Sequence, residues 1–153
     1  MPAKAPAQRS TSFSNQAELP SSPRKLLKTA RKALRHVLRD DRYLVKMYLS
    51  YHVETGMPGN PTSVNLAGAT MAYCYDLPVL EHNVPIIPSL QEQKKLDALS
   101  QIELGNIDLF YTLLGRKKPK HLSPVLPPIY YGYDLPDGCK PLLKRLTKLI
   151  DQL

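Results

Sequence analysis

The sequence predicts a mostly α-helical fold: a single compact domain of about four to five helices, with long proline-rich connections and at most a short strand pair. Three observations support this prediction. Apolar residues recur at helical spacing in several separate segments. The 15 prolines lie mainly between those segments, where they interrupt helices. A chain of 153 residues is also long enough to bury one core.

The first helix is expected from residue 22 to about residue 39. Ser22 suits the N-cap, and Pro23 suits the first helical position. On a helical wheel one side is apolar and carries Leu27, Ala30, Leu34, Val37 and Leu38. The opposite side is basic, so the segment is strongly amphipathic.

Short elements separated by turns are expected in the middle of the chain. Residues 42–52, RYLVKMYLSYH, lean towards extended structure because they are rich in Tyr, Leu and Val. ETGMPGNPT is a loop, after which Thr62 or Ser63 can cap a helix. That helix carries small residues that predict close contact with a neighbouring element: Ala67, Gly68, Ala69 and Ala72.

Two helical pieces follow an extended, proline-containing stretch at residues 79–88. Ser89 and Glu92 have capping-box spacing, and the helix that they open carries Leu96, Leu99 and Ile102 or Glu103 in register. Gly105 and Asn106 interrupt it. A second piece, IDLFYTLL, is ended by Gly115.

The C-terminal part combines an irregular arm with a final helix. Residues 116–138 contain five prolines and two glycines, which exclude a regular element. From about Lys140 to Leu153, one side of a helix is apolar and carries Leu142, Leu143, Leu146, Leu149 and Ile150. Lys144, Arg145 and Lys148 lie towards the other side.

We expect two regions along the chain: a flexible N-terminal tail over residues 1–21 and a single mainly helical domain over residues 22–153. The tail has no apolar segment of the secretory type, and its composition is that of disordered chains. No run of 18 or more apolar residues predicts a membrane span. The two cysteines, Cys74 and Cys139, indicate a reducing compartment, since a disulfide framework would use more.

The net charge of +8 is distributed unevenly. Residues 24–46 carry nine Lys and Arg against two Asp, residues 47–115 are net acidic at −5, and residues 116–153 are net basic at +5. This pattern predicts a polarised surface, but it is equally compatible with terminal helices held by the acidic middle of the chain.

No catalytic or metal-binding constellation is apparent. The four histidines are scattered and the cysteines lack metal-ligand spacing, so we predict no metal site and no cofactor. Phosphate-loop, dinucleotide and hydrolase motifs are missing from the sequence. We therefore expect a protein that is not an enzyme.

The strongest positive feature is a basic stripe on the first helix, formed by Arg24, Lys28, Arg31, Lys32, Arg35 and Arg39. No acidic residue lies between Arg24 and Arg39, so something acidic outside this helix should compensate the stripe. The candidates are nucleic-acid phosphates, the acidic middle of the chain, or an acidic patch on another protein. A secondary basic and aromatic arm carries Arg116, Lys117, Lys118, Lys120, Tyr130, Tyr131 and Tyr133.

Several motifs together resemble a group of small, uncharacterised proteins of tailed bacteriophages and prophages. These motifs are RDDRYLVKM, the "LAGA" helix in LAGATMAYCYDLP, KKLDALSQIELGNIDLFYTLLG and the Leu-rich final helix. The resemblance spans residues 24–153. Many members carry cysteines just before "LAGA", where this chain has Thr62–Asn65. The resemblance implies a phage origin and expression in the cytoplasm of a bacterial host, but it carries no known activity.

The expected function is that of a small phage-encoded intracellular accessory protein, with a host-interaction or anti-defence type of role. It would act by binding a host or phage macromolecule, with a protein as the first candidate partner. The alternative is direct nucleic-acid binding through the basic first helix. No membrane partner is expected, because the apolar side of that helix lacks Trp and Phe. Virion association and oligomeric state are left open.

Overall fold

The fold is mostly α-helical, as the sequence predicts. The computed structural model describes residues 19–39, 43–45, 53–54, 62–74, 89–122, 126–129 and 139–153. Within these ranges five helices are present: α2 (Pro23–Leu38), α3 (Leu66–Cys74), α4 (Leu90–Leu104), α5 (Ile107–Leu113) and α6 (Lys140–Asp151). The N-terminal tail up to residue 18 and the extended stretch at residues 79–88 lie outside the described residues.

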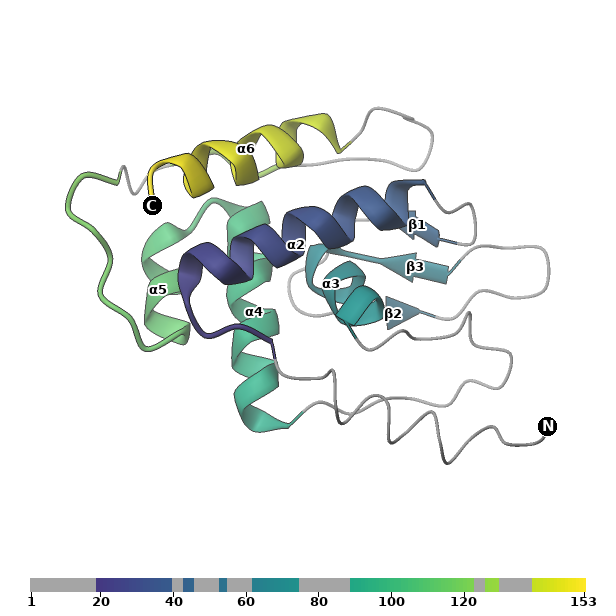
Figure 1. The fold of residues 1–153 in the computed structure, drawn as a ribbon, viewed down its shortest axis with the longest axis horizontal. Helices are drawn as coiled ribbons and strands as arrows, with labels where there is room; N and C mark the ends of the chain where they lie inside the picture. The colour runs from purple at the N-terminus through teal and green to yellow at the C-terminus, as the bar shows by residue number, and fades with distance from the viewer. Residues whose placement is uncertain are drawn as a thin grey trace.

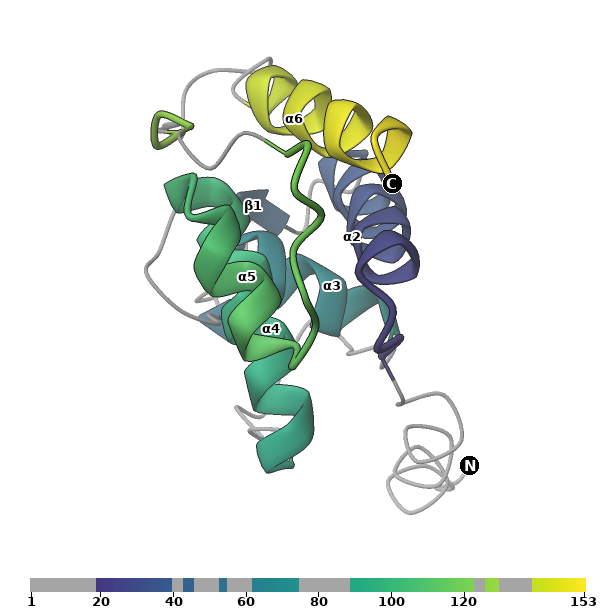
Figure 2. The same cartoon turned by 90° about the vertical axis from the view of Figure 1, so that its left-hand side faces the viewer.

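Helix α2 has a central position in the domain. It packs against α3 on one side and against α6 on another, while α3 contacts α4 and α4 contacts α5. Figures 1 and 2 show α6 lying along α2 in the opposite direction, so that the end of α6 is next to the start of α2. The first and last described helices therefore form an antiparallel pair.

A small sheet lies near the C-terminal end of α2 (Figure 1). It contains β1 (Tyr43–Val45), β2 (Val53–Glu54) and β3 (Thr62–Val64) in the order β1-β3-β2. β1 pairs with β3 in parallel, and β2 pairs with β3 in antiparallel orientation. The extended tendency of residues 42–52 is thus confirmed for β1, but the described residues form three strands instead of one strand pair.

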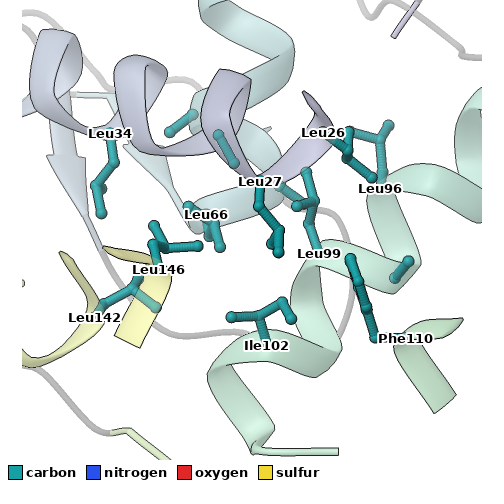
Figure 3. Packing of buried hydrophobic residues seen from close by; sticks show 14 of the residues in the cluster. Leu26, Leu27, Leu34, Leu66, Leu96, Leu99, Ile102, Phe110, Leu142 and Leu146 are labelled. Carbon is teal, nitrogen blue, oxygen red and sulfur yellow. The ribbon is translucent and has the colours of Figure 1, made fainter. Parts of the chain in front are cut away.

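The core is made by apolar side chains from all five helices. Figure 3 shows Leu34 of α2 next to Leu142 and Leu146 of α6, while Leu27 points towards Leu66 and Leu99. All six side chains are almost completely buried. Burying a leucine side chain contributes about 1.5–3 kcal/mol, so these contacts are the main force that joins α6 to α2.

The buried side of α2 differs slightly from the expected one. Leu27, Ala30, Leu34 and Val37 are buried, but Leu38 is 41% exposed. Leu26 and Ala33 are buried in its place, and Figure 3 shows Leu26 next to Leu96 of α4. The buried arc is therefore rotated away from Leu38, which lies at its edge in the last turn.

Helix α3 begins later than expected, and its cap is a different residue. Thr62 and Ser63 lie in β3, and the Asn65 side chain caps the helix by accepting a hydrogen bond of 2.7 Å from the Gly68 backbone N–H. Residues Leu66 to Ala72 are all buried, as expected for a helix that packs between α2 and α4. The close contact predicted from its small residues is confirmed.

Enlarging Ala69 should overpack this contact. Ala69 is completely buried, so an Ala69→Leu side chain has to displace its neighbours. We expect the free energy of unfolding to fall by roughly 1–3 kcal/mol, measured by urea denaturation. Ala69→Gly removes volume without adding any and serves as the contrasting variant. An unchanged stability of Ala69→Leu would contradict the tight packing of α3.

The ends of α4 and α5 follow local sequence rules. Ser89 Oγ accepts a hydrogen bond of 3.2 Å from the Glu92 N–H, and Asn106 Oδ1 accepts one of 3.1 Å from the Leu109 N–H. Gly105 ends α4 with φ of 83°, which favours glycine. A side chain at Gly105 would also collide with the Leu126 backbone. Both the backbone conformation and the available space therefore require glycine at this position.

The domain begins before the expected boundary at residue 22. The Leu19 side chain is 2% exposed and belongs to the core. Its backbone is held by two side chains of α4: the Leu19 N–H donates to Glu92 Oε2 at 3.2 Å, and the Leu19 carbonyl accepts from Lys95 Nζ at 2.6 Å. Glu92 and Lys95 also pair with each other at 3.2 Å. Residues 19–21 therefore belong to the folded domain and not to the tail.

Candidate partner-binding surface

Helix α2 presents its basic stripe at the surface of the domain. Arg24, Lys28, Lys32, Arg35 and Arg39 are exposed, and Arg31 is half-buried. Lys25 is exposed on the same helix. The amphipathic pattern explains this placement, because the apolar side of α2 is covered by α3 and α6 and leaves the cations outside.

Arg31 lies where α2 meets α6. Its Nη1 donates a hydrogen bond of 3.2 Å to Oγ1 of Thr147 on α6. Arg24 and Lys28 precede Arg31 by seven and three residues, and Arg35 follows it by four, so all three share its side of the helix. These four residues of the stripe therefore lie on the edge of α2 that borders α6.

Helix α6 continues the basic surface on the other side of this contact. Lys140 and Lys144 precede Thr147 by seven and three residues, so both lie on the side of α6 that borders α2. Both are exposed, as is Lys148 one turn further. We call the set formed by Arg24, Lys28, Arg31, Arg35, Lys140 and Lys144 the basic seam. The contribution of α6 cannot be seen in the sequence, because it depends on which helix packs beside α2.

Five of the seam cations have no acidic counterpart within the described residues: Arg24, Lys28, Arg31, Arg35 and Lys144. The ion pairs seen between described residues are Lys95–Glu92 and Lys118–Asp108, and neither involves these five cations. Helix α2 contains no acidic residue, and the one carboxylate of α6 is Asp151 in its last turn. Asp40 and Asp41 lie outside the described residues. Internal charge pairing of the stripe, one of the three expected alternatives, is thus not seen in the described part of the chain.

The secondary basic arm is only partly described. Arg116, Lys117 and Lys120 are exposed, whereas Lys118 pairs with Asp108 at 2.8 Å. Tyr130, Tyr131 and Tyr133 lie outside the described residues. Next to Lys120, a ring nitrogen of His121 is 3.0 Å from the Gln152 carbonyl oxygen at the end of α6. Figure 2 shows the arm rising from α5 to α6, and the His121 contact places residue 121 at the C-terminal end of α6.

Arg145 was expected on the outer side of α6, but it has a structural role. Its Nη1 donates to the carbonyl oxygens of Ile102 at 2.7 Å and Glu103 at 3.3 Å, in the last turn of α4. Its Nη2 donates to the carbonyl oxygen of Pro127 in the arm. Partial burial lowers the pKa of the guanidinium, which still remains charged at neutral pH. Arg145 therefore joins three segments and is not part of the basic seam.

The ionisable groups in the interior also hold the backbone. Glu103 is fully buried, and its Oε1 accepts a hydrogen bond of 3.0 Å from the Leu66 N–H at the start of α3. A carboxylate in this position complements the positive end of the helix dipole. Glu92 holds Leu19 in a similar way. In the described ranges no group of three or more His, Cys, Asp and Glu side chains could hold a metal ion.

Both thiols lie in environments that disfavour the thiolate. Burial, with a smaller contribution from the Glu92 carboxylate, raises the pKa of Cys74 from 9.0 to about 11. Burial and the Glu103 carboxylate raise the pKa of Cys139 to about 12. Activated nucleophiles have depressed pKa values, so the structure argues against a catalytic role for either cysteine.

Thiol alkylation should be slow in the folded protein. A pKa raised from 9.0 to about 11 lowers the thiolate fraction of Cys74 about 100-fold at pH 8. The thiolate fraction of Cys139 is lowered further, because its pKa is raised to about 12. We expect iodoacetamide to react at least about 100-fold faster with the urea-unfolded protein. The same shifts stabilise the folded state below pH 9, and this stabilisation is lost as the pH rises from 9 towards 11. Equal rates in the two states would contradict the assigned environments.

Comparison with known proteins identifies no relative. No protein-family model matches the chain. No curated protein and no solved structure matches it either. In the described part of the chain, no helix has the combination of length and apolar composition that crossing a membrane requires. The resemblance to phage proteins therefore rests on the motifs quoted above.

Proposed function

We propose that the protein is a small phage-encoded accessory protein that acts in the cytoplasm of its bacterial host by binding an acidic host or phage macromolecule. The role would be of the host-interaction or anti-defence type. The phage assignment is supported by the resemblance of residues 24–153. The binding mode is supported by one observation above all: six cations line the border between α2 and α6, and the ion pairs of the described residues involve none of Arg24, Lys28, Arg31, Arg35 and Lys144.

Long rows of one charge sign are unfavourable unless something compensates them. Like charges three or four residues apart on a helix destabilise it by a few tenths of a kcal/mol per pair. Arg24, Lys28, Arg31 and Arg35 are spaced in this way along α2, and none of them forms an ion pair with a described residue. A partner with the opposite charge would remove this repulsion, so the seam is suited to intermolecular contact.

Binding explains the arrangement better than catalysis does. An active site needs polar groups that converge on a shared space where a substrate can sit. Here the buried groups Glu92, Glu103 and Arg145 are instead engaged by backbone atoms of neighbouring elements. Their chemistry is used to hold Leu19, the start of α3 and the arm.

Neutralising three seam residues should abolish binding without affecting the fold. For the Arg24→Gln, Lys28→Gln, Arg35→Gln variant we expect the free energy of unfolding to change by less than about 0.5 kcal/mol, because the three side chains are exposed. Affinity capture from phage-infected host cells should recover a partner with the wild-type protein and lose it with this variant. Capture that is equally strong with the variant would contradict the proposal.

A matched control has to carry the same loss of charge at another place. Lys94 on α4 is exposed and belongs neither to the seam nor to the basic arm. Lys94→Gln should leave capture intact if the seam is the binding surface, whereas the matched single seam change Lys28→Gln should weaken it. Performing both captures with and without nuclease separates partners that are nucleic acid, or are bridged by it, from proteins that bind directly.

A further inference from the structure

We infer, on the basis of the proposed function, that the acidic partner is a nucleic-acid duplex, and that the seam binds its phosphate backbone without reading the base sequence. Nucleic acid is the alternative partner class that the sequence predicts. It rests on the side-chain composition of the seam and on the width of the two-helix surface.

The surface of α2 and α6 lacks the side chains that anchor protein partners. Protein interfaces have an apolar centre rich in Tyr, Trp, Phe and Met, and they are depleted in Lys. Within the described residues, Leu38 is the one large apolar side chain exposed on these two helices, and it lies at the end of α2. Most of the remaining exposed residues are Lys and Arg, and the others are His36, Pro141 and Asp151. Phosphate groups need only such cations, so this composition fits a nucleic acid better than a protein.

The spacing of the cations matches the charge density of a duplex. Arg24 and Arg35 are separated by 11 residues, or about 16 Å along the helix axis at 1.5 Å per residue. A duplex of that length carries roughly nine or ten phosphates. A flat protein surface can reach only the phosphates on the face of the duplex that it meets. The six cations of the seam are therefore comparable in number to the phosphates within their reach.

The width of the seam argues against entry into the major groove. Packed helices have axes 8–10 Å apart and are each about 10–12 Å wide, so two of them side by side span about 20 Å. The major groove is about 12 Å wide and admits a single helix. Because α6 lies along α2, neither helix can enter the groove alone (Figure 1). The seam then lies across the phosphates, and base edges stay out of reach.

The side chains on the seam also point to sequence-independent binding. Asn and Gln are the residues that recognise adenine in the major groove, and neither occurs in α2 or α6. Arg24 and Arg35 could in principle contact guanine, but an arginine reads bases only from within a groove. We therefore expect contacts of the positioning kind, which carry no sequence information.

The experiment measures fluorescence anisotropy with two labelled 24-base-pair DNA duplexes of unrelated sequence. The wild-type protein should bind both with affinities that differ by less than about threefold. The plot of log affinity against log salt concentration should have a slope of about −5, corresponding to six neutralised phosphates. The Arg24→Gln, Lys28→Gln, Arg35→Gln variant should reduce this slope to about −3. The single seam variant Lys28→Gln should reduce the slope by about one, and the matched Lys94→Gln control should keep the wild-type slope.

Three results would overturn the inference. The first is that neither duplex binds at 50 mM salt. The second is a reduction of the salt slope in the control variant equal to that in the seam variant, which would mean that net charge alone determines the affinity. The third is a preference of more than about 100-fold for one duplex, which would indicate base reading. Thermal unfolding of each variant confirms that it is folded.

Failure of this inference can be told apart from failure of the proposed function. If duplexes do not bind, but the seam captures a host or phage protein after nuclease treatment, the proposed function holds and the partner is a protein. If neither a duplex nor a captured protein depends on the seam, both proposals are wrong. A polyglutamate peptide serves as a third probe, and binding as tight as that of the duplexes would show that the seam accepts any polyanion.

Discussion

Replacing Glu103 by alanine should lower the free energy of unfolding by about 2–4 kcal/mol. The substitution leaves the Leu66 N–H without its buried acceptor and creates a cavity where a fully buried side chain lay. Because Leu66 is the first residue of α3, the loss also removes the negative charge that complements the start of this helix. Urea denaturation, followed by circular dichroism, measures the effect.

Glu103→Gln is the matched control for this prediction. The amide oxygen of glutamine can still accept the hydrogen bond from Leu66, and the side-chain volume is kept. The decrease in the free energy of unfolding should therefore be clearly smaller for Glu103→Gln than for Glu103→Ala, although both variants lack the negative charge. A loss below about 1 kcal/mol for Glu103→Ala would show that α3 is held by its apolar contacts alone.

Replacing Arg145 by methionine should destabilise the protein by about 2 kcal/mol. The apolar volume is nearly kept, but the carbonyl oxygens of Ile102, Glu103 and Pro127 lose a charged donor. The guanidinium is partly exposed, so solvent screening keeps the effect below that of a fully buried group. Thermal unfolding gives the stability, and limited proteolysis reports whether the arm near Pro127 has come loose.

Arg145→Lys should rescue less than half of this loss. An ammonium group cannot place donors on three carbonyl oxygens in the way that the planar guanidinium does. If lysine restored full stability, the charge at this position would matter and the fork geometry would not. The comparison therefore tests the assignment of Arg145 as the residue that joins α6, α4 and the arm.

The parts of the fold that depend on neighbouring residues could be predicted from the sequence. The start of α2 at Pro23, the cap at Ser89, the end of α4 at Gly105 and the burial of Leu27 and Leu34 follow from propensity, capping and apolar spacing. These signals act over three or four residues, which is the range that a single sequence displays directly.

The parts that depend on distant residues could not be predicted. Thr62–Val64 is a strand because β1 and β2 pair with it, and its sequence resembled a helix cap when taken alone. Arg145 looked like a solvent-facing cation, although two of its three acceptors lie more than 40 residues earlier. The part of the candidate site on α2 was predictable, since the stripe is local. Its continuation on α6 was not, because nothing local indicates that the last helix packs beside the first.

The pairing of α2 with α6 has a consequence for the order of events during synthesis. About 100 residues separate the end of α2 from the start of α6, so a ribosome adding 5–20 residues per second needs roughly 5–20 s between them. During that interval Leu34 has no Leu142 or Leu146 to cover it, and α2 offers an uncovered apolar side next to its cations. The two-helix surface can form only after α6 has left the ribosome exit tunnel. Nascent chains that stop before Lys140 therefore cannot display the complete basic seam, and they expose a surface that chaperones bind.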